Sequence, residues 1–105
     1  MKLTIENGVL YADNLQICYA EVKNGCALVR SGPRTVRSQY SPANGSVLPL
    51  VDDFGWLAND ADGAIILGRV RTRNGALPCQ STLDRVIALI EQCEDNDKAV
   101  TLEVN

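Results

Sequence analysis

Apolar and polar residues alternate over the first part of the chain, and Asn-Gly pairs separate the alternating runs. The runs cover residues 3–6, 9–11, 15–22 and 26–30, and the pairs between them are Asn7-Gly8 and Asn24-Gly25. A period of two is that of a β-strand, and Asn-Gly favours the tight turn that joins antiparallel strands. The pattern predicts two linked hairpins, which form a meander of about four strands.

The middle of the chain predicts shorter strands and more loop. Residues 35–40 alternate, and the run 47–51 is apolar but contains Pro49, which has no N–H to donate, so it is predicted as an edge strand at most. Residues 52–63 are predicted to be irregular, with at most a helical turn. The run 64–67 is apolar on both faces, which predicts a buried strand that emerges into solvent after Gly68.

One amphipathic helix is predicted over residues 82–93, with Ser81 as its N-cap. The apolar residues that share one face of it are Leu83, Val86, Ile87, Leu89, Ile90 and Cys93. Residues 100–104 alternate again as a final strand. The chain is therefore predicted to be an α+β protein: a mainly antiparallel β-meander sheet of about five to seven short strands, one C-terminal helix packed on it, and a C-terminal strand that joins the sheet.

Composition limits the class of protein. The 105 residues, 46% hydrophobic and 22% charged, fit a single compact domain spanning 1–105 with a mostly aliphatic core. No stretch approaches the roughly 18 apolar residues of a membrane span, and the N-terminal residues lack a signal-peptide core. We therefore expect a cytoplasmic protein with reduced cysteines. The cysteines form no CxxC pair and the chain has no histidine, so neither a zinc site nor a cofactor is expected.

The arginines are clustered although the net charge is −3. Six of the seven lie in two short segments, and these six are Arg30, Arg34, Arg37, Arg69, Arg71 and Arg73. In a β-strand the alternation of the second segment would place its three guanidiniums on one face. Such a row is an anion-binding surface, a set of salt bridges to Asp52, Asp53, Asp60 and Asp62, or a charged strand edge that prevents aggregation.

A second candidate for contact is the segment that holds the only phenylalanine and the only tryptophan, Phe54 and Trp56, directly after Asp52 and Asp53. Tryptophan and arginine dominate the energetics of protein interfaces, so this segment is a candidate anchor. Alternatively, both rings fill the core. The candidate binding residues are thus the six clustered arginines together with Asp52, Asp53, Phe54 and Trp56.

Catalytic and metal-binding patterns are weak. Without histidine the commonest general base is missing, and Cys79, six residues after the second arginine segment, is the one candidate nucleophile. Residues 59–63 resemble the start of a calcium loop, but Ala58 and Arg69 occupy positions where that loop needs ligands. No metal is expected.

The sequence favours a small cytoplasmic, non-enzymatic binding or accessory protein that acts through protein–protein contact, as immunity proteins, inhibitors and gene-cassette products do. One alternative is a nucleic-acid or phosphate-ligand binding domain that uses the two arginine segments, although no aromatic residue lies beside residues 69–73 for base stacking. A second alternative is a small enzyme without histidine. A homodimer, in which an arginine segment of one copy meets acidic residues of the other, is a further possibility.

Overall fold

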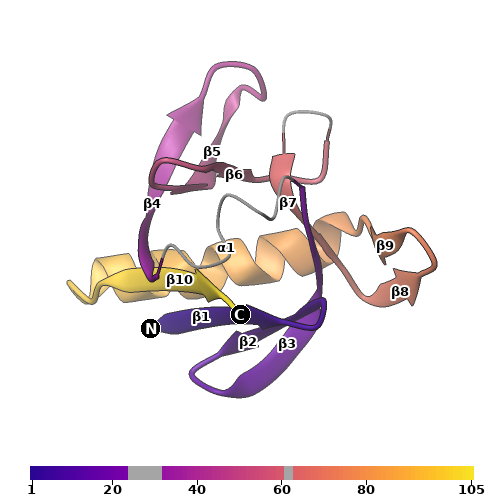
Figure 1. Ribbon diagram of the computed structural model, residues 1–105. Coiled ribbons are helices and arrows are strands. Elements are labelled where there is room, and N and C mark those ends of the chain that lie inside the picture. Colours follow the sequence, from indigo (N-terminus) through magenta and orange to yellow (C-terminus); the bar gives the residue numbers. More distant parts are fainter. Residues whose placement is uncertain (24–31, 61–62) are drawn as a thin grey trace.

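The computed structural model describes residues 1–23, 32–60 and 63–105, and these residues form ten strands and one helix (Figure 1). The strands are β1 Lys2–Glu6, β2 Val9–Ala12, β3 Leu15–Val22, β4 Arg34–Ser41, β5 Ser46–Val51, β6 Gly55–Leu57, β7 Gly63–Gly68, β8 Val70–Thr72, β9 Gly75–Leu77 and β10 Val100–Val104. The helix is α1, Gln80–Asp95.

Eight strands close into a barrel in the order β1-β10-β4-β5-β6-β7-β3-β2, and β8 and β9 form a separate two-stranded sheet. The prediction of an open meander sheet of five to seven strands is therefore wrong. Parallel pairing of β1 with β10 joins the two ends of the chain, and antiparallel pairing of β3 with β7 brings together segments more than 40 residues apart. A period-two pattern identifies strands but carries no information about which distant strands pair.

The local predictions for the N-terminal region are confirmed where the structure describes them. β1 and β2 form the expected hairpin, and Asn7 and Gly8 both adopt positive φ, 52° and 74°. β3 covers the predicted residues 15–22. The strand predicted at 26–30 and the Asn24-Gly25 turn lie outside the described residues.

Two predictions for the middle of the chain need correction. β5 is not an edge strand, since it pairs with β4 on one side and with β6 on the other. It tolerates Pro49 because β6 pairs only with Leu50 and Val51, so Pro49 has no partner on that side. Residues 55–57, predicted to be irregular, form β6, a three-residue strand too short to produce a detectable alternation.

β7 is buried on both faces, as the sequence predicted. Ile65 and Leu67 belong to the barrel core, whereas Ile66 points to the opposite face and is still only 4% exposed. The β8–β9 hairpin supplies the second cover, because β9 packs against both β7 and β3. The hairpin thus lies outside the barrel, beside these two strands (Figure 1).

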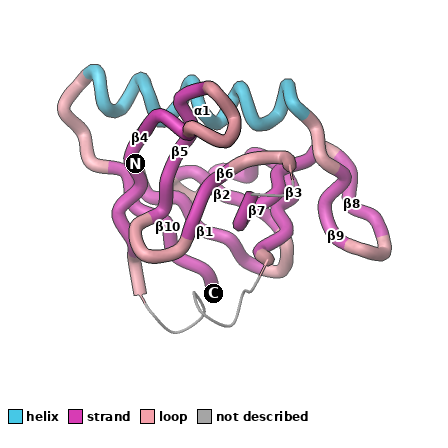
Figure 2. Tube along the Cα trace, turned by 90° about the horizontal axis from the view of Figure 1, so that it is seen from above, coloured by secondary structure: helices cyan, strands magenta, loops and turns pink. Residues whose placement is uncertain are grey.

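The helix extends two residues beyond the prediction at each end, and its N-cap is Cys79 rather than Ser81. It lies across one end of the barrel, where Leu83, Val86 and Ile90 are fully buried (Figure 2). The final strand, β10, is confirmed and joins the sheet between β1 and β4. Over the described ranges, no helix is both long and apolar enough to span a membrane.

Candidate functional site

The β8–β9 hairpin is attached to the barrel through close backbone contacts. A Cβ atom on Gly68 would lie 1.9 Å from the carbonyl oxygen of Leu77, so only glycine lets the two chains approach this closely. Beside this contact, the N–H of Cys79 donates a hydrogen bond to the carbonyl of Leu67, with 3.1 Å between nitrogen and oxygen. These contacts fix β9 against the end of β7.

Asn59 completes this attachment. Its side-chain Oδ1 accepts a hydrogen bond from the N–H of Leu67, and its Nδ2 donates to the carbonyl of Cys79, both at 2.9 Å. β6 ends at Leu57 and so cannot pair with Leu67 of β7. The side chain of Asn59 accepts the hydrogen bond from the Leu67 N–H that a neighbouring strand would otherwise accept. The same amide positions Cys79, from which α1 begins.

The three arginines of the second segment do not form one row. Arg71 is the only one inside a strand; Arg69 precedes β8 and Arg73 lies in the turn. The Arg71 guanidinium lies over the ring of Tyr19, 4.9 Å from its centroid, and donates to the carbonyl of Asn7. Arg71 therefore joins the hairpin to the barrel, which is a structural role.

The first arginine segment is paired within the protein. Arg37 forms a 2.8 Å ion pair with Asp52, while Arg34 forms one of 3.6 Å with Asp53 and donates to the backbone carbonyl of Asp52 at 3.3 Å. Of the alternatives that the sequence left open, internal salt bridges describe Arg34 and Arg37. Arg30 lies outside the described residues.

The aromatic pair of the Asp52–Trp56 segment packs inward. Phe54 and Trp56 are both half-buried and contact the hydrophobic core, and Trp56 lies opposite Leu50 in the β5–β6 pair. Neither ring stands free as an interface anchor. The structure thus brings Asp52 and Asp53 together with Arg34 and Arg37, and it separates this cluster in the fold from the second arginine segment.

The outer side of the β8–β9 hairpin carries an exposed apolar pair. Val70 and Leu77 lie directly opposite each other in the strand register and are 54% and 53% exposed. Together with Arg69, Pro78 and Cys79 they line a pocket of about 260 Å³. We call the surface formed by Arg69, Val70, Leu77 and Pro78 the hairpin face.

The hairpin face was missed by the sequence reasoning, which chose the arginines and not the apolar residues between and after them. The register that places Val70 opposite Leu77 comes from a two-residue turn at Arg73 and Asn74, one residue earlier than a turn made by Asn74-Gly75 would lie. Their exposure could not be predicted, since it depends on which side of the hairpin covers Ile66.

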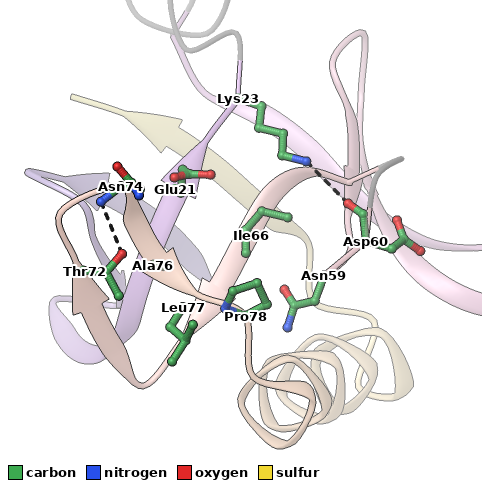
Figure 3. Close-up of a pocket in the computed structure, with 10 residues that line it drawn as sticks. All are labelled: Glu21, Lys23, Asn59, Asp60, Ile66, Thr72, Asn74, Ala76, Leu77 and Pro78. Atoms are coloured by element: carbon green, nitrogen blue, oxygen red, sulfur yellow. Dashed lines mark hydrogen bonds between the residues drawn. The ribbon is translucent and has the colours of Figure 1, made fainter.

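A second pocket, of about 450 Å³, lies between the hairpin and the loop after β6 (Figure 3). Ile66 lies at its centre in this view, while Glu21 and Lys23 of the β3 end approach from different sides. The Lys23 ammonium donates to the backbone carbonyl of Asp60 at 3.4 Å. This pocket and the pocket of the hairpin face share Leu77 and Pro78, so the β9 end separates them.

Cys79 has an unusually acidic thiol. At the helix N-cap its Sγ lies 3.2 Å from the Ser81 hydroxyl, and hydrogen bonds from the Ser81 side chain and from Thr82 lower the pKa of the thiol to about 7. By contrast, burial in the barrel raises the pKa of Cys18 to about 11, with Arg85 opposing the change. Cys79 is thus partly thiolate at neutral pH.

The chain matches no protein family, no curated protein sequence and no solved structure. No relative therefore assigns a role to any of these residues. Within residues 1–23, 32–60 and 63–105, no three metal-ligating side chains lie together either. The geometry offers an exposed apolar pair with an arginine at its border, on an element outside the barrel.

Proposed function

We propose that this protein is a non-enzymatic binding protein of the cytoplasm that acts by contact with a protein partner through the hairpin face. The observation that carries the proposal is the cross-strand pair of Val70 and Leu77, each more than half exposed. Exposed apolar residues bordered by polar groups are typical of interaction sites, and arginine is enriched in such interfaces.

The Arg34–Asp53 and Arg37–Asp52 pairs are less suited to be the main contact. Ion pairs at the surface that are already satisfied within one chain gain little when a partner adds another charge. Phe54 and Trp56 are half-buried against the core, so part of each ring is already covered. On the hairpin face, more than half of each apolar side chain is in solvent.

Nucleic acid fits this surface less well than protein does. Binding of single strands without sequence preference needs aromatic rings on which bases stack. The ring of Tyr19, which lies beside the hairpin, is covered by the Arg71 guanidinium. The pocket of the hairpin face is lined mainly by aliphatic groups of Val70, Leu77 and Pro78. Such a surface is suited to apolar side chains rather than to a sugar-phosphate chain.

The test compares partner retention by three forms of the tagged protein in extracts of its source cells. These are the wild type, the double variant Val70→Glu/Leu77→Glu, and the control Leu15→Glu, which alters a still more exposed apolar residue of β3. We expect at least one protein to be retained by the wild type and the control and lost by the double variant. Retention of the same proteins by all three forms contradicts the proposal.

Each form is also unfolded by heat, followed by circular dichroism, before the comparison is made. Because Val70, Leu77 and Leu15 are exposed, all three forms should have nearly the same Tm. If a variant loses the partner while its Tm is unchanged, the loss comes from the altered surface and not from unfolding.

A further inference from the structure

The chemistry of the partner can be inferred from charge, and this inference rests on the proposed function. Residues 69–80 contain three arginines and no acidic residue, and the first turn of α1 is free of acidic residues as well. Arg69 and Arg73 are exposed and form no ion pair with any described residue. The N-terminal end of α1 adds its own partial positive charge. Arg69 and Arg73 therefore present positive charge that no ion pair with a described residue neutralises. The negative groups beside the hairpin are the Glu21 carboxylate, which lies against Gly75, and the Cys79 thiolate at the N-cap of α1.

The size of the pocket limits what enters it. At about 260 Å³ it is smaller than the roughly 300–1,000 Å³ of pockets that hold small molecules. It is lined by Arg69, Val70, Leu77, Pro78 and Cys79, and most of its lining is apolar. A space of this size with apolar walls fits one large apolar side chain of a partner protein.

The strand edge defines the shape of the partner segment. In the described part of the chain β8 pairs with β9 only, so the backbone groups on its other side have no ladder partner. Edges of this kind accept an extended peptide as an additional strand. In an extended chain, alternate side chains then face the same way as those of β8.

We propose that the hairpin face binds an extended acidic segment of a partner protein. In this complex the segment pairs along β8, one of its apolar side chains fills the pocket between Val70, Leu77 and Pro78, and its carboxylates pair with Arg69 and Arg73. Arginine suits this role because its guanidinium binds a carboxylate through two hydrogen bonds.

The experiment uses synthetic fluorescein-labelled peptides of about ten residues, because the partner itself is not identified. One peptide alternates glutamate with leucine, a second has lysine in place of every glutamate, and a third has the same composition as the first with its glutamates grouped at one end. Binding to the wild-type protein is followed by fluorescence anisotropy at about 0.1 M and about 1 M salt. We expect the alternating acidic peptide to bind most tightly and to lose affinity at high salt.

Variants of the protein locate the binding surface. Arg69→Glu/Arg73→Glu is expected to weaken binding of the acidic peptide by about tenfold or more, because the new carboxylates repel its glutamates. Val70→Ser/Leu77→Ser is expected to weaken it by a similar factor, because the pocket loses the apolar side chains that contact the leucines of the peptide. The control is Lys98→Glu, a charge reversal of an exposed residue beyond the far end of α1. It should bind as the wild type does, apart from a small effect of net charge.

The outcomes separate this inference from the proposed function. Equal affinity for the acidic and basic peptides overturns the inference that the partner segment is acidic. Peptide binding that neither double variant weakens overturns it as well. Both results hold even if the hairpin face retains a protein in the extract experiment. Binding of a labelled single-stranded oligonucleotide that Arg69→Glu/Arg73→Glu abolishes, with none of the peptides bound, overturns it in favour of nucleic acid. If all three forms retain the same proteins in the extract experiment while the acidic peptide binds as expected, the proposed function is overturned.

Discussion

Asn59 offers the sharpest test of how the hairpin is held against the barrel. Replacement of Asn59 by alanine removes both hydrogen bonds that its amide makes, to the Leu67 N–H and to the Cys79 carbonyl. Leu67 is fully buried, and its N–H would lose the Asn59 oxygen as its hydrogen-bond acceptor. An unsatisfied buried donor costs about 1–3 kcal/mol.

The second bond contributes less. The Cys79 carbonyl also accepts from the N–H of Leu83 at 3.1 Å, so it keeps a partner in the variant. Loss of the bond from Asn59 therefore costs only the net value of a hydrogen bond, about 0.5–1.5 kcal/mol. Together the two effects predict that Asn59→Ala lowers the free energy of unfolding by about 2–4 kcal/mol, a large share of the roughly 5–15 kcal/mol of a typical domain.

Urea unfolding at 25 °C, followed by circular dichroism, measures this difference. The matched control is Asn96→Ala, which removes a 2.8 Å side-chain hydrogen bond to the carbonyl of Gln92 at the exposed end of α1 and should cost less than about 1 kcal/mol. The reasoning is refuted if Asn59→Ala is no more destabilising than Asn96→Ala. A changed urea dependence would show instead that the variant no longer unfolds in two states.

Two further predictions concern the same region. Gly68→Ala places a Cβ atom against the Leu77 carbonyl, so hydrogen exchange of the Cys79 N–H should accelerate. The control Gly45→Ala, at a φ of 65° in open space, should lower the free energy of unfolding by about 1–2 kcal/mol without altering exchange of that amide. Equal exchange of the Cys79 N–H in both variants contradicts the packing argument. The rate at which iodoacetamide alkylates Cys79, measured by peptide mass spectrometry, should rise with pH around a midpoint near 7, because the lowered pKa makes the thiolate available above that pH. Ser81→Ala removes a hydrogen bond to the thiol and should move the midpoint upward. A wild-type midpoint near 9 would contradict the hydrogen-bond explanation.

The parts of the fold that could be predicted from the sequence are those that depend on neighbours in the chain. The β1–β2 hairpin follows from Asn7-Gly8, and α1 follows from a period of 3.6 in its apolar residues. Closure of the barrel depends instead on β1 meeting β10 and β3 meeting β7, and no local pattern encodes either pairing. The double burial of β7 was visible as an unbroken apolar run, but the element that covers Ile66 was not.

The candidate site was predictable only in part, because charge was visible and pairing was not. The arginine segments stand out in the sequence, yet Arg34 and Arg37 are neutralised by Asp52 and Asp53, and Arg71 is held by Tyr19. These ion pairs and the ring contact form between residues that are distant in the sequence, so they depend on the tertiary fold and could not be predicted from local patterns. Of the five clustered arginines that the structure describes, Arg69 and Arg73 have neither an ion pair nor a ring contact, and they lie beside apolar residues that the sequence reasoning did not select.

The register of the hairpin explains how one small element serves both the fold and the surface. Arg71 lies opposite Ala76, and both turn towards the barrel, where Ala76 is buried and Arg71 contacts Tyr19. Val70 lies opposite Leu77, and because side chains alternate along a strand, this pair must point away. Substitutions of the inward pair should therefore change stability, and substitutions of the outward pair should change binding alone. A one-residue shift of the hairpin register would exchange the two roles, which is why the backbone contact at Gly68 and the amide of Asn59 matter for recognition as well as for folding.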